Sequence, residues 1–464
     1  MRKDNNYHKN KSGKKAGFTS GAGVSTKNRF PTKPEAQAGT KHATNSVSKG
    51  KDEYNSVFKG KNEHNSVFKG KDEHNIVSGS KGDHEFILPC RFGVESVLKR
   101  EVHALGYDTL PGTDGRVVFR GGAEALCRAS VNIRTAERIL INVGSFKATT
   151  YDELFEGTKA LEIERFVPKN GAFTIAKAGS VRSKLFSPSD IQSIVKKAMA
   201  VRLSEKYHLD WLPEDGENYP FRVFIIDDVV TIGLDTSGAS LHKRGYRLKS
   251  AKAPLSENLA AAMILLTPFR DSRIMVDPFC GSGTIPIECA MIAAGIAPGV
   301  NRHFVAEDWG FIDGKFWKQA REEARSHEKQ SIEADIQGYD IDGDVISTAR
   351  ENAERAGVAH MIHFQRRAVS ELRHSGSYGF IITNPPYGER IGEEEELQEI
   401  YSALGKGYRA LDRWSLYMIS SYDNAEKYLG LRPDKVRKIY NGMIRASFYQ
   451  YVGEKPGKRS QPGK

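Results

Sequence analysis

The stretch Arg273-Ile274-Met275-Val276-Asp277-Pro278-Phe279-Cys280-Gly281-Ser282-Gly283-Thr284 decides the fold. Its apolar first half predicts a strand over 273–277, and the apolar run that follows the turn predicts a helix from Thr284 to Ala294. The glycine-rich turn between them lets backbone amides approach a ligand beyond the carboxyl end of the strand. Its spacing is neither Gly-x-Gly-x-x-Gly nor Gly-x4-Gly-Lys-Ser/Thr, which disfavours a nicotinamide site and a phosphate loop. A strand–turn–helix connection without a ligand is the alternative for this motif alone.

Strand and helix patterns alternate after this motif. Strands are predicted over 336–340, 362–365, 380–383 and 415–420, and helices over 344–356 and 423–429. Asn441-Gly442 separates two further strand patterns, 435–440 and 443–452, and this dipeptide favours a hairpin. The alternation predicts an α/β, doubly wound parallel sheet. With the antiparallel C-terminal hairpin, the pattern is typical of the Rossmann-like class I methyltransferase fold.

The chain before this sheet has a different pattern. Strands at 86–90, 115–120 and 138–143 with helices at 93–105 and 123–131 predict a small α+β unit. A second α+β unit is predicted from Thr150, with helices at 151–159 and 188–207 and strands at 172–176, 222–226 and 229–234. Asp227-Asp228 is expected to form a tight hairpin turn. The segment 298–335, rich in aromatic residues, is an insertion to which the sequence assigns no role.

Both ends of the chain are basic and of low complexity. Residues 1–84 carry a net charge of +9 and the last ten residues +4, so the formal net charge of +11 belongs to the two ends and the rest of the chain is near −2. Residues 1–84 and 454–464 are predicted to be disordered tails. A ten-residue repeat runs through 49–58, 59–68 and 69–78. These tails are interpreted either as solvated tethers or as accessory contacts to a polyanion.

Cysteine usage and hydropathy exclude several classes of protein. Cys90, Cys127, Cys280 and Cys289 form no Cys-x-x-Cys, which argues against a zinc site or a disulfide framework and fits a reducing cytosol. No apolar run approaches the roughly 20 residues of a membrane span, and the N-terminus lacks the apolar stretch of a signal peptide. We therefore expect a cytoplasmic protein with no metal site and no membrane partner.

Acidic residues at strand ends predict a nucleoside cofactor. Asp277 can answer the positive charge or the amino group of S-adenosylmethionine (SAM), and Asp340, at the end of the next strand, can hydrogen-bond both ribose hydroxyls. Asp342 is either a second acidic contact or the N-cap of the following helix. The candidate cofactor residues in these two segments are Asp277, Pro278, Phe279, Cys280, Gly281, Ser282, Gly283, Thr284, Asp340, Ile341 and Asp342.

A fourth strand pattern stops at the candidate catalytic residues Asn384, Pro385, Pro386 and Tyr387. The prolines remove two backbone donors and stiffen the turn, leaving the Asn384 side chain and the carbonyls of Asn384 and Pro385 as acceptors with few local partners. Acceptors in a fixed fork suit a planar NH2 group, and Tyr387 offers a flat face for a base. Gly388-Glu389-Arg390 are interpreted as a pocket lip or a surface ion pair. An ordinary strand-ending turn is the alternative for the tetrapeptide alone.

Residues 86–453 resemble THUMP-domain class I RNA methyltransferases, and specifically the RlmL-type 23S rRNA guanine-N2 methyltransferases. The resemblance is carried by LHKRGYR at 241–247, APLSENLAAAMI at 253–264, DPFCGSGTIPIECA at 277–290, NPPYGERIG at 384–392 and YNGMIRASFYQY at 440–451. It implies a ferredoxin-like subdomain over 85–148, a THUMP RNA-binding domain over 149–247 and a SAM-dependent methyltransferase domain over 248–453. At 365–370, where such enzymes carry an acidic adenine contact, the chain reads Gln-Arg-Arg-Ala-Val-Ser, so the Ala368 backbone is expected to serve.

The resemblance implies methyl transfer from SAM to guanine N2 in a structured RNA, 23S rRNA or a ribosomal assembly intermediate. Other planar NH2 groups stay open as substrates, namely guanine N2 in tRNA, adenine N6 in RNA or DNA, and a protein glutamine amide. A non-catalytic RNA-binding assembly factor is the alternative from another class.

Overall fold

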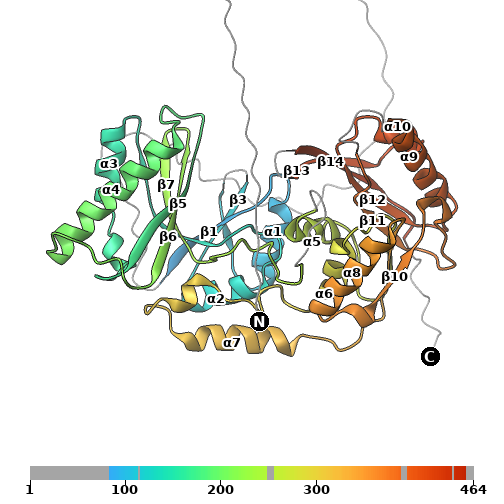
Figure 1. Ribbon diagram of the computed structural model, residues 1–464, viewed down its shortest axis with the longest axis horizontal. Coiled ribbons are helices and arrows are strands. Elements are labelled where there is room, and N and C mark those ends of the chain that lie inside the picture. The colour runs from blue at the N-terminus through green and yellow to red at the C-terminus, as the bar shows by residue number, and fades with distance from the viewer. Residues whose placement is uncertain (1–82, 113–114, 248–254, 388–393, 442–443, 456–464) are drawn as a thin grey trace, which may run out of the picture. The chain divides into compact units, whose positions relative to one another are not determined.

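The structure is a computed structural model that describes residues 83–112, 115–247, 255–387, 394–441 and 444–455, and its strands form two seven-stranded sheets (Figure 1). The predicted tails 1–84 and 454–464 lie almost wholly outside the described residues, and so do Gly388, Glu389 and Arg390. No helix among the described residues is long and apolar enough to cross a membrane.

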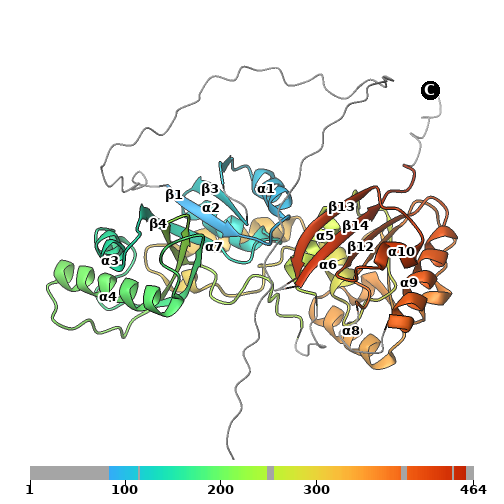
Figure 2. The same ribbon diagram turned by 90° about the horizontal axis from the view of Figure 1, so that it is seen from above.

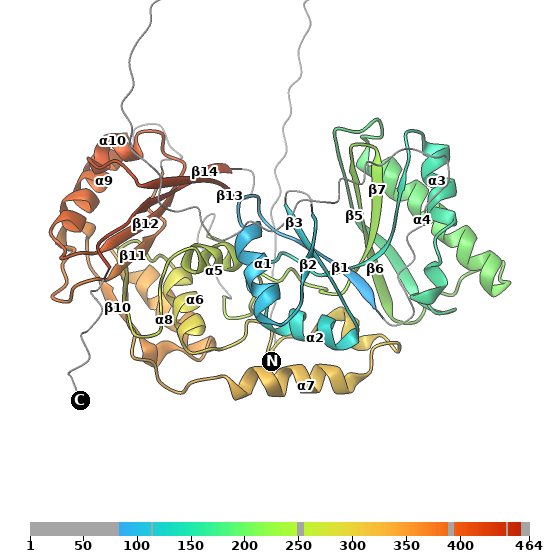
Figure 3. The same ribbon diagram turned by 180° about the vertical axis from the view of Figure 1, so that it is seen from behind.

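The first sheet has the order β2-β3-β1-β4-β7-β6-β5. Its strands are β1 (His84–Pro89), β2 (Thr109–Leu110), β3 (Arg116–Gly121), β4 (Leu140–Lys147), β5 (Ala172–Val181), β6 (Asn218–Ile226) and β7 (Val229–Asp235). Its helices are α1 (Glu95–Ala104), α2 (Ala123–Asn132), α3 (Tyr151–Lys159) and α4 (Pro188–Tyr207). Figure 3 shows α3 and α4 side by side. Helix α3 also contacts β4, and α4 contacts β5.

The two α+β units that the sequence pattern separates share this one sheet. Strand β4 pairs with β1 on one side and with β7 on the other, where Leu140 faces Asp235 and Lys147 faces Val229. The strand begins and ends later than the predicted 138–143, and its pairing with β7 contains a register shift between Asn142 and Gly144. The predicted hairpin at Asp227-Asp228 is confirmed, since Ile226 pairs with Val229 and both aspartates have positive φ, 51° and 63°.

The second sheet has the order β10-β9-β8-β11-β12-β14-β13, and Figure 2 shows β13 and β14 at one end of it. Strands β8 to β12 are parallel, and β14 is antiparallel to both of its neighbours, which confirms the predicted fold. Its strands are β8 (Ile274–Asp277), β9 (Asp335–Asp340), β10 (Ile362–Arg366), β11 (Phe380–Thr383), β12 (Ser415–Ser420), β13 (Lys435–Asn441) and β14 (Ile444–Tyr451).

Helices cover both faces of this sheet. They are α5 (Glu257–Leu265), α6 (Thr284–Ala293), α8 (Gly343–Arg355), α9 (Glu394–Arg409) and α10 (Ala425–Leu429). Figure 1 shows α6 and α8 on one face and α9 and α10 on the other. Neighbouring residues of β8 belong to different hydrophobic clusters on the two faces of the sheet. Met275 is in the cluster with residues of α5, α6 and α8, and Val276 is in the cluster with residues of α9 and α10. The short strands are therefore apolar on both faces, as buried parallel strands must be.

The insertion 298–335 packs on the first sheet's core. It contains α7 (Gly314–Ser326), which contacts α2, and Glu323 on α7 accepts two hydrogen bonds from Arg128 at 2.7 and 2.8 Å. Trp309 is buried, stacks on Tyr219 and donates its indole N–H to the Asn218 carbonyl at 3.0 Å. A segment from the middle of the second half of the chain thus completes the core of the first half.

Candidate functional site

The carboxyl ends of three adjacent parallel strands, β9, β8 and β11, meet at one edge of the second sheet. Asp277 ends β8 and is 1 % exposed. Its Oδ1 accepts hydrogen bonds from the Thr383 hydroxyl at 2.6 Å and from the Phe279 amide at 3.1 Å. Burial, reinforced by the nearby Asp340 carboxylate, raises the pKa of Asp277 to about 7. Because this pKa lies close to neutral pH, a cation that binds beside the carboxyl group would strongly change its degree of ionisation.

The glycine loop folds over this strand end. The Cys280 amide donates to the Tyr339 carbonyl and the Gly283 amide to the Cys280 carbonyl, both at 2.8 Å. Gly281 and Gly283 have positive φ, 53° and 85°. A Cβ on Gly283 would lie 3.0 Å from the Ala349 Cβ, so the turn requires glycine there for both conformation and space. The Cys280 thiol is buried, which raises its pKa well above the ordinary value and does not suit a nucleophile.

Asp340 joins the loop to the end of β9. Its Oδ2 accepts from the Gly281 amide at 3.0 Å and its Oδ1 from the Asp342 amide at 3.1 Å. Partial burial raises the pKa of Asp340. Asp342 is the N-cap of α8, since its Oδ1 accepts from the Asp344 and Val345 amides at 2.9 and 3.4 Å. The cap role of Asp342 is therefore present in the structure, and its role as a second acidic contact stays a prediction.

The other predicted cofactor residues lie around this carboxylate. Ile341 has a side chain 69 % exposed directly after β9, and its carbonyl accepts from the Arg366 side chain at 2.9 Å. Ala368 follows β10 in an extended conformation, half-buried, and the Arg367 amide beside it donates to the Asp340 carbonyl at 2.9 Å. The backbone at 366–368 thus lies alongside the acidic strand end.

The Asn384–Tyr387 turn follows β11, the strand on the other side of β8. The Asn384 Oδ1 accepts a hydrogen bond from the Tyr387 hydroxyl at 2.8 Å, so this acceptor has a local partner that the sequence reasoning did not foresee. Pro385 is buried and Pro386 is exposed. The Pro386 carbonyl accepts from the Tyr401 hydroxyl at 3.1 Å, and that hydroxyl also lies 2.6 Å from the Ser420 hydroxyl. The turn is thereby fixed from α9 and β12.

Family comparisons agree with this architecture. Residues 85–140 match the RlmL ferredoxin-like domain, residues 148–235 the THUMP domain, and residues 244–450 the RMKL-like methyltransferase domain. The chain is 44 % identical over 361 residues to the "Putative RNA methyltransferase YpsC" of Bacillus subtilis, covering 77 % of this chain and 93 % of that protein. The chain belongs to the RMKL-like methyltransferase family. The predicted resemblance to THUMP-domain methyltransferases of the RlmL type is confirmed.

Other members of the RMKL-like family are longer. A "Ribosomal RNA large subunit methyltransferase K/L" of Syntrophotalea carbinolica is 35 % identical over 378 residues, which are 76 % of this chain but only 51 % of that protein. The chain thus spans about half the length of this relative. Among solved structures, the protein titled "SMU.472, a putative methyltransferase complexed with SAH" superposes with a TM-score of 0.76 at 36 % identity, covering 81 % of this chain and all of that one.

Three residues that support this RMKL-like site were missed from the sequence. Thr383 donates to Asp277, Tyr401 holds the Pro386 carbonyl, and Asn352, fully buried on α8, donates to the Ser282 carbonyl at 3.0 Å. Thr383 precedes the predicted Asn384 at the end of β11. A prediction that β11 is the neighbour of β8 could therefore have indicated that Thr383 lies beside Asp277. Asn352 is a polar residue on the apolar face of a predicted helix, which is itself a signal that it has a partner.

Proposed function

We propose that this chain transfers a methyl group from SAM to the exocyclic N2 amine of a guanine in 23S rRNA. The observation that supports it is the meeting, at one sheet edge, of Asp277 with its glycine loop, Asp340, and the Asn384–Tyr387 turn. We further propose the division 85–148, 149–247 and 248–453, in which the first two domains bind the RNA and the third carries the reaction.

The residues at this edge fit SAM. The Asp340 carboxylate would accept hydrogen bonds from ribose hydroxyls, and a sulfonium or ammonium group beside the Asp277 carboxyl would favour its ionised form. A Cβ on Gly281 would meet nothing within 4 Å, so no side chain stands between this part of the loop backbone and a ligand. SAM, when bound, supplies an electrophilic methyl group. The relative SMU.472, which was crystallised in complex with SAH, supports the same choice of cofactor.

Residues Asn384 to Tyr387 would prepare the amine. Guanine N2 is a poor nucleophile because its lone pair is delocalised into the ring. The Asn384 Oδ1 keeps a second lone pair besides the one that faces Tyr387. With the Pro385 carbonyl, it can accept both amine hydrogens, which pulls the nitrogen toward tetrahedral geometry and aims its lone pair. This is catalysis by positioning and electrostatics. Tyr387 would stack on the flipped base, and no strong general base is needed, since the nitrogen becomes acidic once methylated.

The affinity for SAM should rise with pH. Because the pKa of Asp277 is about 7, this carboxyl is largely protonated at pH 6 and largely ionised at pH 8. A cationic ligand binds the ionised form better and so releases a proton near neutral pH. Calorimetry of SAM binding between pH 6 and 8, in two buffers of different ionisation enthalpy, measures both effects.

The Asp277→Asn variant is the control for this pH dependence, and it should bind SAM with nearly the same affinity at pH 6 and 8. In the unliganded protein the same pKa makes the contribution of Asp277 to folding stability fall as the pH rises, whereas the SAM affinity rises. The folded state holds the proton more tightly than the unfolded chain, so this group's contribution to stability is greatest below pH about 4 and falls as pH rises to about 7. A SAM affinity independent of pH in the wild type would contradict the assigned role of Asp277.

The substrate is tested with separated nucleic acids. Labelled methyl groups from SAM should enter 23S rRNA taken from a strain that lacks the enzyme, and nuclease digestion should return N2-methylguanosine. Incorporation only into tRNA, 16S rRNA or DNA, or recovery of N6-methyladenosine, would replace the proposed substrate while keeping the reaction class. If calorimetry detects no binding of SAM or SAH, the chain is instead the non-catalytic RNA-binding factor.

A further inference from the structure

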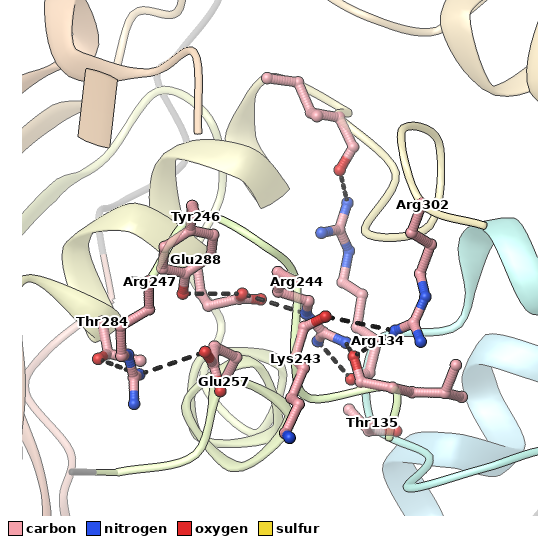
Figure 4. Close-up of polar contacts among 12 residues, drawn as sticks. Arg134, Thr135, Lys243, Arg244, Tyr246, Arg247, Glu257, Thr284, Glu288 and Arg302 are labelled. Carbon is pink, nitrogen blue, oxygen red and sulfur yellow. Dashed lines mark hydrogen bonds and ion pairs between the residues drawn. The ribbon is translucent and has the colours of Figure 1, made fainter. Parts of the chain in front are cut away.

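A buried ionic network holds the segment Leu241–Arg247, here called the strap, against α6 (Figure 4). Arg244 and Glu288 have side chains 2 % and 0 % exposed, and the Arg244 Nε lies 3.3 Å from the Glu288 Oε1. The Tyr246 hydroxyl donates to the same oxygen at 3.3 Å. Two charged groups are out of water at this point, which is costly unless the geometry of the pair is maintained. The strap is therefore fixed to the middle of α6.

Arg244 also reaches the first half of the chain. Its guanidinium donates to the Arg134 carbonyl, just after α2, and to the Leu241 carbonyl, both at 2.6 Å. The Arg134 guanidinium in turn donates to the Ile296 carbonyl, beyond the C-terminal end of α6, at 2.6 Å. Figure 4 shows Arg244 between Arg134 and Glu288. Through these bonds the strap, α6 and the end of α2 form one connected polar unit.

Arg247 contacts the other end of the same helix. Its guanidinium donates to the Thr284 hydroxyl at 2.6 Å and to the Leu255 carbonyl at 3.0 Å, and it lies 3.5 Å from the Glu257 carboxylate. Thr284 is the first residue of α6 and directly follows Gly283 of the glycine loop. Thr284 and Glu288 are four residues apart, so they share one face of α6. The strap thus holds α6 at two successive turns, one of them adjacent to the cofactor loop.

We propose that Arg247 is a positioning residue for SAM binding, which acts through the Thr284 hydroxyl to set the start of α6 and hence the glycine loop. Loop amides bind a ligand well only when their positions are held to a fraction of an ångström. One guanidinium nitrogen, Nη2, makes the contacts to Thr284, Leu255 and Glu257. A lysine side chain ends one bond short of that nitrogen, so its ammonium group does not occupy the same place. The inference rests on the proposed function in taking SAM as the cofactor.

The test compares Arg247→Lys with a matched control, Arg128→Lys. Lysine keeps the charge beside Glu257, whose pKa is raised by burial, so the variant leaves no unpaired buried carboxylate. Arg128 also pairs with a glutamate, Glu323 on α7, but none of its contacts involves α6. We expect Arg247→Lys to weaken SAH binding about tenfold in calorimetry, and Arg128→Lys to change it by less than about twofold. Hydrogen exchange at residues 279–287 should quicken in Arg247→Lys alone.

A double-mutant cycle with Thr284→Val tests the route of the effect. If Arg247 acts through the Thr284 hydroxyl, the double variant should bind SAH no more weakly than the weaker single variant, and Thr284→Ser should bind as the wild type does. Two outcomes would overturn the proposal. One is that the losses of SAH affinity in the two single variants add in the double variant. The other is that Arg247→Lys lowers the unfolding temperature but binds SAH with wild-type affinity. Thr284→Val keeps the test available if Arg247→Lys fails to fold, because wild-type affinity in that variant also overturns it. A wild-type protein that binds no SAH would instead refute the proposed function.

Discussion

Methyl transfer should fall by about 10³-fold when Asn384 is replaced by Ala, because the variant loses an acceptor that is aligned with the reacting amine. SAH affinity should stay within about twofold of the wild type, since Asn384 lies after β11 and the candidate cofactor residues lie after β8, β9 and β10. Single-turnover transfer of labelled methyl groups at saturating SAM, with calorimetry of SAH binding, measures the two quantities separately. Loss of transfer without loss of binding is the pattern expected of a group that acts in the transition state.

Two conservative variants sharpen this prediction. Asn384→Asp keeps an oxygen acceptor at the same place and should retain measurable turnover. Tyr387→Phe removes the hydroxyl that donates to the Asn384 Oδ1 but keeps the ring, so it should lower transfer much less than Asn384→Ala. If Asn384→Ala retains most of its turnover, the tetrapeptide is only a strand-ending turn.

Replacement of Asp340 by Ala should weaken SAH binding by about 100-fold. The substitution removes acceptors for the ribose hydroxyls, and hydrogen bonds to a charged group are worth about 1.5–3 kcal/mol each. It also releases the Gly281 and Asp342 amides that the carboxylate now holds. Calorimetric titration with SAH gives the affinity, and circular dichroism shows whether the variant is folded.

Asp342→Ala is the matched control for Asp340. Because Asp342 caps α8, its loss should cost about 1 kcal/mol of stability, as N-cap substitutions do. SAH affinity should change little. Should the two variants lose affinity equally, Asp342 would have a direct ligand contact as well, and the distinct role of Asp340 would fail.

Local patterns predicted most of the second sheet. The strands, their alternation with helices and the hairpin after Asn441 follow from hydrophobic period and turn chemistry, which act over a few residues. Helix α9 was missed, although Leu397, Tyr401 and Leu404 recur at helical spacing along its buried face. Glu394, Glu395 and Glu396 lie in its first turn, where negative charge favours a helix start, so the sequence carried a second signal for this helix.

The supporting contacts of the site could not be predicted in the same way. Thr383 and Asp277 are 106 residues apart, and they meet only because β8 and β11 are neighbours in the sheet. The spacing of apolar residues predicts which face of a helix or strand is buried, but it does not predict which distant residue that face contacts. The same limit applies to Trp309, whose aromatic character was noted but whose position against Tyr219 depends on packing between distant segments.

The packing of 298–335 onto the first sheet bears on how this family can evolve. Trp309, Phe304 and Trp317 are encoded within the catalytic half, yet they are buried in the core of the other half. A recombination event that exchanged only the half with the second sheet would bring aromatic residues that do not fit the core of the other half. Large aromatic surfaces would then be left exposed. The two halves are therefore expected to be inherited together, and to diversify through their surfaces rather than by shuffling.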